Sequence, residues 1–343
     1  MKALVLKAHG EIDQVAIEEM EAPKPKRGEV LVNIKAAALN HLDLWVVQGM
    51  PGLKLQFPHV LGADGSGVVA QVGEGVTRIK RGDPVMINPG LNCGTCEYCE
   101  MGEHSLCPKF SILGEHVPGT FAEYVAVPET NVVALPKASS YEEAAASSLV
   151  FLTAWRMLVT RGRIKPSETI LIHGIGGGVS LACMQITLAM GLRVIVTSSS
   201  TDKVERAMGL GAHFGINHTL KDVAKEVREL TNGQGVDTVV DSIGEQTWET
   251  SLKCLKRGGK LVTCGATTGG NPPADINRIF WNQISIIGST MGSMSDFREF
   301  VRFMGIKKIR PIIHRSYSLE EGMTALEDLK NQRQFGKIVL NVS

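Results

Sequence analysis

The stretch ETILIHGIGGGVSLACMQI, residues 168–186, decides the fold of this chain. It places an apolar run, TILIH, directly before a cluster of glycines and then an apolar segment with helical character. Such a turn suits phosphate binding, because glycines let the backbone approach the ligand and the N-terminus of a helix attracts anions. The stretch therefore predicts a dinucleotide-binding βαβ unit. A tight glycine turn without a ligand is the structural alternative.

The pattern around this stretch divides the chain into two kinds of sequence. From about residue 151 to residue 286, apolar strands alternate with helical stretches, which predicts a doubly wound parallel sheet. Residues 1–150 contain short β-like runs separated by Gly and Pro, which predict a partly closed β-rich domain. The last part, residues 287–343, ends in GKIVLNV, a strand long enough to rejoin that first domain.

The second strand of the βαβ unit bears on the choice of cofactor. It ends in VIVTSSSTDK, residues 194–203, with Ser198 where an NAD-specific site carries Asp or Glu. An acid would repel a 2′-phosphate, whereas serine hydroxyls donate hydrogen bonds to it and Lys203 adds positive charge. The sequence therefore favours NADPH over NADH. The predicted cofactor-binding residues are Gly176, Gly177, Gly178, Val179, Ser198, Ser199, Ser200, Lys203, His218 and Lys337.

A second motif, LNCGTCEYCEMGEHSLCP at residues 91–108, has cysteine spacing typical of a metal site. Four thiolates fill the tetrahedron around Zn²⁺ and leave no position for water or substrate. We therefore predict a structural zinc that holds a loop in shape, in preference to four unligated thiols. The predicted ligands are Cys93, Cys96, Cys99 and Cys107.

Composition excludes several classes of function. The 36 basic and 35 acidic side chains nearly cancel and form no long basic run, so we expect neither a nucleic-acid nor a membrane partner. The N-terminal residues lack a signal-peptide pattern, and no stretch of about 18 apolar residues occurs. The other three cysteines are scattered in apolar segments, which fits a reduced compartment. A cytoplasmic protein with a small-molecule substrate is expected.

Several stretches together make the chain resemble the medium-chain dehydrogenase/reductase superfamily over essentially its whole length. They are EVLVNIKAAALNHLDLWVVQG, PHVLGADGSGVVAQVGEGV, the cysteine lobe, FLTAW, the glycine turn and GKIVLNV. This superfamily contains zinc alcohol dehydrogenases and quinone oxidoreductases. The resemblance implies a GroES-like catalytic domain over residues 1–150 and 287–343, a Rossmann domain over residues 151–286, and one structural zinc. It also implies a homodimer or homotetramer.

The catalytic zinc of the family is a separate site, and its ligand positions are altered in this chain. The matching residues are Asn40, Ala63 and Leu149, none of which binds zinc as the family's ligands do. Nearby groups offer an improvised site as an alternative, although single histidines beside apolar strands are more often structural. These groups are His41, Asp43, His59, Asp64 and His116. The resemblance also gives His41 a competing role, contact with the cofactor pyrophosphate.

The altered ligands favour a chemistry that does not need zinc. Zinc lowers the pKa of a bound hydroxyl from about 16 to about 7, so an alkoxide formed without it costs on the order of 12 kcal/mol more. Reduction of a quinone or conjugated C=C bond is less demanding, and N-x-x-D and G-x-D-G-x-G resemble the quinone-oxidoreductase branch. We therefore predict an NADPH-dependent reductase of quinones or α,β-unsaturated carbonyls without the family's catalytic zinc. The predicted catalytic residues are Asn40, His41, Asp43, Asp64 and Thr153.

Two other functions remain open at this point. One is an alcohol dehydrogenase with an atypical catalytic metal site. The other is a non-catalytic NADPH-binding protein, as in lens crystallins that resemble quinone reductases.

Overall fold

The computed structural model describes residues 1–342 and divides the chain into two compact units. One unit comprises residues 1–149 together with the chain from residue 292 onward, and the other comprises residues 150–291. The boundaries expected from the sequence were residues 150 and 286. The first unit is called the catalytic domain below, and the second the cofactor domain.

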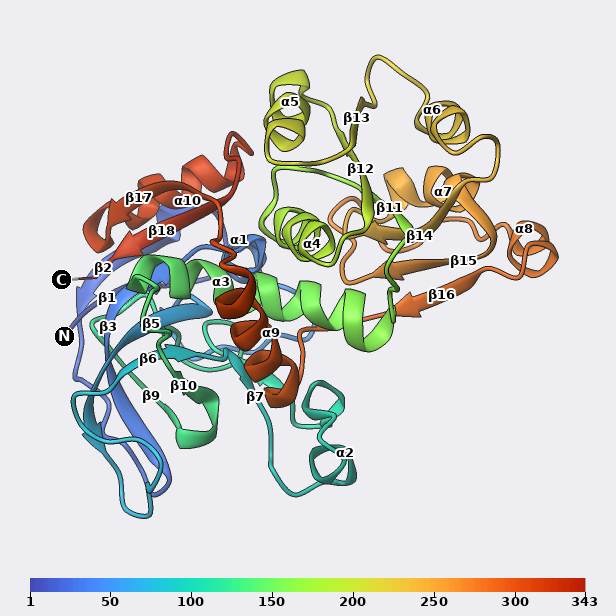
Figure 1. The fold of residues 1–343 in the computed structure, drawn as a ribbon. Coiled ribbons are helices and arrows are strands. Elements are labelled where there is room, and N and C mark those ends of the chain that lie inside the picture. The colour runs from blue at the N-terminus through green and yellow to red at the C-terminus, as the bar shows by residue number, and fades with distance from the viewer. Residues whose placement is uncertain (343) are drawn as a thin grey trace. The chain divides into compact units, whose positions relative to one another are not determined.

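The cofactor domain is built on a six-stranded parallel sheet with the strand order β13-β12-β11-β14-β15-β16 (Figure 1). Its strands are β11 (Thr169–Ile172), β12 (Arg193–Ser198), β13 (Phe214–Asn217), β14 (Val236–Asp241), β15 (Leu255–Thr263) and β16 (Ser285–Gly288). Its helices are α4 (Gly178–Ala189), α5 (Thr201–Gly209), α6 (Val223–Leu230), α7 (Glu245–Cys254) and α8 (Ile276–Trp281). In Figure 1, α4 and α5 lie on one side of the sheet and α6 and α7 on the other.

The strand order of the cofactor domain identifies the edge of the sheet where a ligand is expected to bind. The order reverses between β11 and β14, and ligands of such sheets bind beyond the carboxyl ends of the strands at that switch point. Strand β11 is buried throughout its apolar run, as expected for a parallel strand covered by helices on both faces. The glycines that follow β11 therefore lie at the ligand-binding edge of the sheet.

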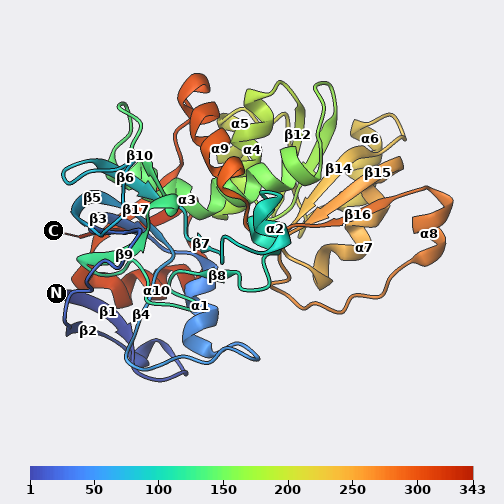
Figure 2. The same cartoon turned by 90° about the horizontal axis from the view of Figure 1, so that it is seen from below.

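The catalytic domain is rich in short antiparallel strands (Figure 2). Its strands are β1 (Lys2–Leu6), β2 (Val15–Glu19), β3 (Glu29–Ala38), β4 (His59–Val60), β5 (Asp64–Val72), β6 (Pro84–Ile87), β7 (Gly90–Leu91), β8 (Ser111–Ile112), β9 (Tyr124–Pro128), β10 (Val132–Ala134), β17 (Ile313–Ser318) and β18 (Lys337–Asn341). Its helices are α1 (His41–Gln48), α2 (Glu97–Glu100), α9 (Met294–Lys307) and α10 (Gly322–Lys330), and α3 (Tyr141–Trp155) begins in it. Both domains confirm the predicted α/β fold with a β-rich domain and a doubly wound sheet.

Strand pairing brings distant parts of the catalytic domain to one place. In the order β10-β6-β5-β3-β18-β17, the long strand β3 lies between β5 and the C-terminal strand β18. Ala38, at the end of β3, pairs with Asp64 on one side and with Val339 on the other. The first residue of β5, the end of β3 and the start of β18 therefore meet.

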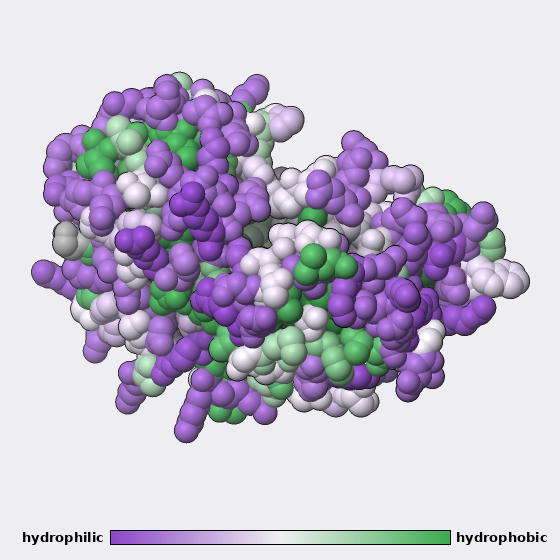
Figure 3. Space-filling view, turned by 90° about the horizontal axis from the view of Figure 1, so that it is seen from above, coloured by the Kyte–Doolittle hydropathy of each residue, from purple (hydrophilic) through white to green (hydrophobic). Residues whose placement is uncertain are grey.

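Within residues 1–342, no helix is both long and apolar enough to cross a membrane. The face drawn in Figure 3 is largely covered by hydrophilic residues, with apolar residues in separate small patches.

Candidate cofactor, zinc and substrate sites

The glycine turn adopts a conformation that requires glycine. Gly174 and Gly176 have φ angles of 66° and 115°, values that side chains disfavour. Gly177 precedes the first residue of α4, so the turn leads into the N-terminus of a 12-residue helix. The hydroxyl of Ser180, in the first turn of α4, lies 2.8 Å from the Gly174 carbonyl and 2.9 Å from the Gly177 carbonyl and donates its one proton to this pair of acceptors. The serine thus fastens the turn to the helix.

Lys203 lies against this turn. A Cβ atom added to Gly176 would be 2.9 Å from Lys203 Cδ and 3.6 Å from Lys203 Nζ. Burial lowers the pKa of Lys203, and the nearby Arg206 acts in the same direction. A partly desolvated ammonium beside a glycine turn is suited to bind phosphate oxygens.

The serines predicted to bind the 2′-phosphate lie at the carboxyl end of β12, and His218 directly follows β13. The Ser198 hydroxyl is buried and accepts a hydrogen bond from Ser200 N (3.2 Å), and the Ser200 hydroxyl accepts one from Lys203 N (3.3 Å). Each hydroxyl keeps its own proton to donate. The amide of His218 donates to the Ser198 carbonyl (3.0 Å), whereas the side chain of Ser199 is exposed.

One residue at this edge, His173, is not among those predicted from the sequence. It directly follows β11 and is 3% exposed, with Nδ1 hydrogen-bonded to Thr197 Oγ1 at 3.0 Å. Within residues 1–342, its Nε2 atom has no hydrogen-bond partner. Burial lowers its pKa, so the ring is neutral near pH 7. The signal that would have found it is a histidine placed between a buried strand and the first glycine.

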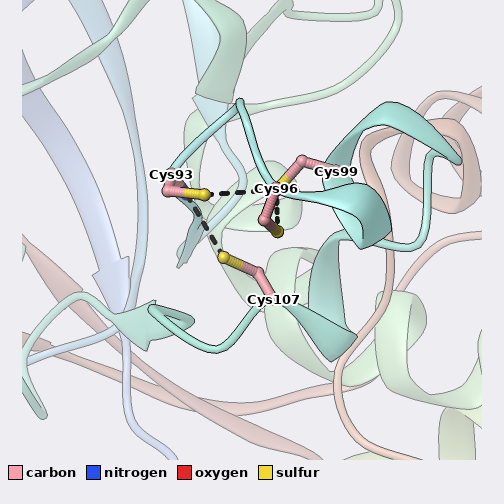
Figure 4. A group of neighbouring side chains, drawn as sticks. All are labelled: Cys93, Cys96, Cys99 and Cys107. Atoms are coloured by element: carbon pink, nitrogen blue, oxygen red, sulfur yellow. Dashed lines mark hydrogen bonds between the residues drawn. The ribbon is translucent and has the colours of Figure 1, made fainter.

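The cysteine lobe forms a closed four-thiolate site (Figure 4). The ligand sulfurs of Cys93, Cys96, Cys99 and Cys107 all lie within 4.8 Å of one another. The Cys96–Cys99 and Cys93–Cys99 sulfur pairs are 3.5 and 3.9 Å apart, close to the edge of about 3.8 Å expected for a Zn–S tetrahedron. Backbone amides of Cys93 and Lys109 donate to the Cys107 sulfur, both at 3.4 Å. The site confirms the predicted structural zinc ligands.

The catalytic domain contains a buried network centred on an ion pair. Lys337 Nζ lies 2.6 Å from the Leu39 carbonyl, 2.6 Å from Asn40 Oδ1 and 2.9 Å from Asp64 Oδ2. The Asn40 amide donates to Asp64 Oδ2 at 2.9 Å, and the Leu149 backbone N–H donates to Asp64 Oδ1 at 2.7 Å. The Lys337 and Asp64 side chains are 5% and 0% exposed. All three ammonium protons of Lys337, a residue predicted to bind the cofactor, are thus used within this domain.

Asp43 adds a second carboxyl group to the network. Its Oδ2 accepts a hydrogen bond from Asn40 N at 2.7 Å. Burial raises the pKa of Asp43 to about 7, opposed by the hydrogen bonds from Asn40 and Gly62 and by the charge of Lys337, and assisted by Asp64. Asp43 therefore holds a proton up to neutral pH.

The remaining predicted residues lie apart from this network. His41 is half-buried and packs edge-on against Trp45, with ring centroids 5.0 Å apart, and burial lowers its pKa. His59 Nε2 is 3.0 Å from the Gly114 carbonyl. In the cofactor domain, Thr153 is buried and its hydroxyl lies 3.9 Å from Met291 Sδ.

The residues at the family's catalytic zinc position do not fit a zinc ion. Asn40 has both amide protons and its carbonyl oxygen engaged, and Ala63 and Leu149 offer no ligand atom. In the part of the chain that the structure describes, the cysteine lobe is the only group of three or more metal-ligating side chains. The improvised site considered from the sequence is not assembled among these residues. We assign no catalytic step to a metal here.

Two family models and several relatives match the chain. Residues 26–137 match the alcohol dehydrogenase GroES-like domain, and residues 178–305 match the zinc-binding dehydrogenase domain. A zinc-type alcohol dehydrogenase-like protein of Schizosaccharomyces pombe, C1773.06c, is 36% identical to this chain, and the match covers 99% of each chain. An NAD-dependent alcohol dehydrogenase of Saccharolobus solfataricus is 32% identical over 95% of this chain and 96% of its own. The crystal structure of an NAD-dependent alcohol dehydrogenase superposes with a TM-score of 0.96, at 46% identity and full coverage of both chains.

These relatives correct the functional prediction. The prediction of a zinc-independent reductase of quinones or enones is wrong, because most of the similar full-length relatives are named alcohol dehydrogenases, several of them zinc-type or NAD-dependent by name. The prediction gave three altered ligand positions more weight than the similarity to alcohol dehydrogenases over the whole chain. The chain is an NAD(P)-dependent enzyme that belongs to the zinc-type alcohol dehydrogenase family of the medium-chain dehydrogenases.

Proposed function

We propose that this enzyme interconverts alcohols and the corresponding aldehydes or ketones by hydride transfer with a nicotinamide cofactor. The observation that carries the proposal is the glycine turn between β11 and α4, with Lys203 beside it. The names of the full-length relatives support an alcohol as the substrate. When bound, the cofactor supplies or accepts the hydride. In the carbonyl direction the hydride adds to carbon, and the oxygen takes a proton.

The residues of this chain have separate tasks in this proposal. The glycine turn and Lys203 bind the cofactor phosphates. Asn40 and Thr153 are proposed to lie near the nicotinamide, and His41 against the cofactor pyrophosphate. The residues at the positions of the family's zinc ligands do not fit the metal. Hydrogen-bond donors therefore polarise the carbonyl in this proposal, and the substrate oxygen takes up a proton.

A substrate panel tests the proposed reaction. We expect reduced cofactor to form with some members of an alcohol panel, and to be consumed with the matching carbonyls near neutral pH. In Gly176→Val, the side chain would meet Lys203 and the backbone would be strained, so both reactions should be lost together with cofactor binding. Gly209→Ala is the control, because nothing lies within 4 Å of the added methyl group. Absence of turnover across both panels would refute the function.

For the cofactor, we propose a preference for NADPH. The support is Ser198 and Ser200 at the end of β12, and Lys203 against the turn, although relatives are named NAD-dependent. A charge-assisted hydrogen bond contributes roughly 1.5–3 kcal/mol, so Lys203→Ala should raise the KM for NADPH by about 10-fold or more. The KM for NADH should change much less. Steady-state kinetics with both cofactors measures this, with the exposed Lys225→Ala as control.

An equal loss for both cofactors in Lys203→Ala would contradict the phosphate-reading role of Lys203. A wild-type enzyme that prefers NADH would contradict the NADPH proposal itself. In that case the specificity of the named relatives applies to this chain as well.

We also propose a homodimer or homotetramer that works in the cytoplasm. The support for assembly is the edge strand β16, which exposes Ile286, and the preceding helix α8, which exposes Ile276, Phe280 and Trp281. The support for the compartment is that the cysteines outside the zinc lobe are unpaired thiols. Light scattering tests the assembly, as described in the Discussion.

A further inference from the structure

We infer that Lys337 is a positioning residue of the catalytic domain, whose ammonium holds together the three chain segments that carry the family's catalytic zinc ligands. These segments contain Asn40, Ala63 with the adjoining Asp64, and Leu149. The inference rests on the proposed function, since it assigns the segments to the reaction centre.

Every proton of the Lys337 ammonium is engaged in a hydrogen bond. Lys337 lies at the first position of β18 and reaches three acceptors within 2.9 Å, from Leu39, Asn40 and Asp64. A lysine ammonium has three protons, so each is used. No donor of Lys337 remains for a substrate, and the residue acts on the reaction through its neighbours.

The Asp64 carboxylate connects Lys337, Asn40 and Leu149. One carboxylate oxygen accepts from Lys337 and from the Asn40 amide, and the other accepts from the Leu149 backbone N–H. The Asp64 carbonyl also accepts a hydrogen bond from Thr120 Oγ1 at 2.6 Å. Asp64 therefore ties the start of β5 to the residue before α1 and to the middle of α3. In this chain the ion pair cross-links the segments that a metal would otherwise join.

Burying this ion pair has a desolvation cost in free energy. The pair is almost completely buried, and replacing a buried ion pair by apolar residues is often neutral or stabilising. A purely structural contact between β18 and β3 could be made by apolar side chains. An ammonium with directional acceptors fixes the orientation of the Asn40 amide, which apolar packing does not.

The experiment compares Lys337→Met and Lys337→Arg with the wild type. Because misplacement by about 1 Å can reduce a rate by about 100-fold, we expect kcat in Lys337→Met to fall by 10- to 100-fold. Binding of NADPH, measured by fluorescence titration, should stay within about two-fold, since the glycine turn and Lys203, which are proposed to bind the cofactor phosphates, lie in the other domain. Lys337→Arg should recover part of kcat because it restores the charge and donors. The control is Lys330→Met, which removes an exposed ion pair with Glu11.

A readout independent of activity keeps the inference separate from the proposed reaction. Hydrogen exchange at the Leu149 amide should be faster in Lys337→Met than in Lys337→Arg or wild type, because Asp64 loses its anchor. If Lys337→Met does not fold, Lys337→Met/Asp64→Asn removes both charges and should fold, with kcat still reduced.

Unchanged kcat together with unchanged Leu149 exchange in a folded Lys337→Met enzyme would overturn the inference. A wild type without turnover on any alcohol or carbonyl would instead refute the proposed function, and faster exchange would then still support the cross-linking role. A further outcome is a Lys337→Met enzyme that loses stability throughout while kcat stays intact, with no recovery in Lys337→Arg. That outcome would show that Lys337 has only a structural role.

Discussion

At the scale of single residues, the network around Lys337 contains two buried carboxyl groups, those of Asp43 and Asp64, and one ammonium. Lys337 balances Asp64, and its three donors are shared among Leu39, Asn40 and Asp64. Within residues 1–342, Asp43 has no ion-pair partner of its own, and burial raises its pKa to about 7, so that it becomes neutral by taking up a proton. The network is electrically balanced when Asp43 is protonated.

This balance predicts a pH dependence of stability. An unfolded aspartate has a pKa near 3.9, whereas the folded Asp43 has a pKa of about 7, so the folded state binds the extra proton between these values. Stability from this group is therefore greatest at the acidic end and decreases as pH rises through neutrality. Asp43→Asn resembles the protonated carboxyl and should remove the decrease. The groups facing Asp43 are Asp64 and Lys337.

Calorimetric Tm values of wild type and Asp43→Asn between about pH 5 and about pH 8 check this prediction, because their difference isolates this group. We expect the variant to gain stability relative to wild type as pH rises. The exposed Asp202→Asn serves as a control with a parallel curve. Parallel curves for Asp43→Asn as well would mean that Asp43 is ionised throughout this range.

At the scale of elements, the zinc lobe depends on its metal for its shape. Helix α2 has only four residues, and a helix this short is not stable by itself in water. Cys96→Ser should therefore lose one zinc per chain relative to wild type and lower the Tm, because the binding energy of a structural zinc is partly folding energy. Elemental analysis and calorimetry measure both effects.

Glu97→Gln, an exposed change in the same helix, is the control for Cys96→Ser and should retain its zinc. Activity per folded molecule should largely survive in Cys96→Ser, because the four thiolates leave no open position for a substrate. Loss of turnover with full zinc retention would contradict this assignment.

The elements also show what the sequence could predict. The glycine turn and the cysteine lobe are each contained in a short stretch, so their spacing alone indicates phosphate and zinc binding. The Lys337 network joins residues separated by 297 positions, and only the pairing of β18 with β3 brings them together. Local sequence does not encode that register, so Lys337 was assigned to the cofactor. The reaction was predicted wrongly for a similar reason, because the three positions of the family's catalytic zinc ligands were interpreted one at a time.

At the scale of the whole molecule, the edge of the cofactor-domain sheet is the feature that points to assembly. Strand β16 ends the sheet order, and Ile286 on it is 41% exposed. Helix α8 precedes this edge strand along the chain and lies near it in Figure 2. Its Phe280 and Trp281 side chains are 60% and 68% exposed. An exposed apolar edge strand is a template for pairing with a second chain unless charge blocks it. We therefore expect β16 to pair with β16 of a second copy about a two-fold axis.

A charge placed on this edge should break the assembly. Ile286→Lys puts an ammonium on the edge, where two copies would face each other across the two-fold axis, and like charges close together destabilise the pairing. Light scattering at micromolar concentration should show a wild-type dimer that becomes a monomer, or a tetramer that falls to a smaller species. Ile306→Lys, at a site 65% exposed on α9, is the matched control and should leave the mass unchanged. A monomeric wild type, or an Ile286→Lys protein with the wild-type mass, would show that the apolar edge does not mediate assembly.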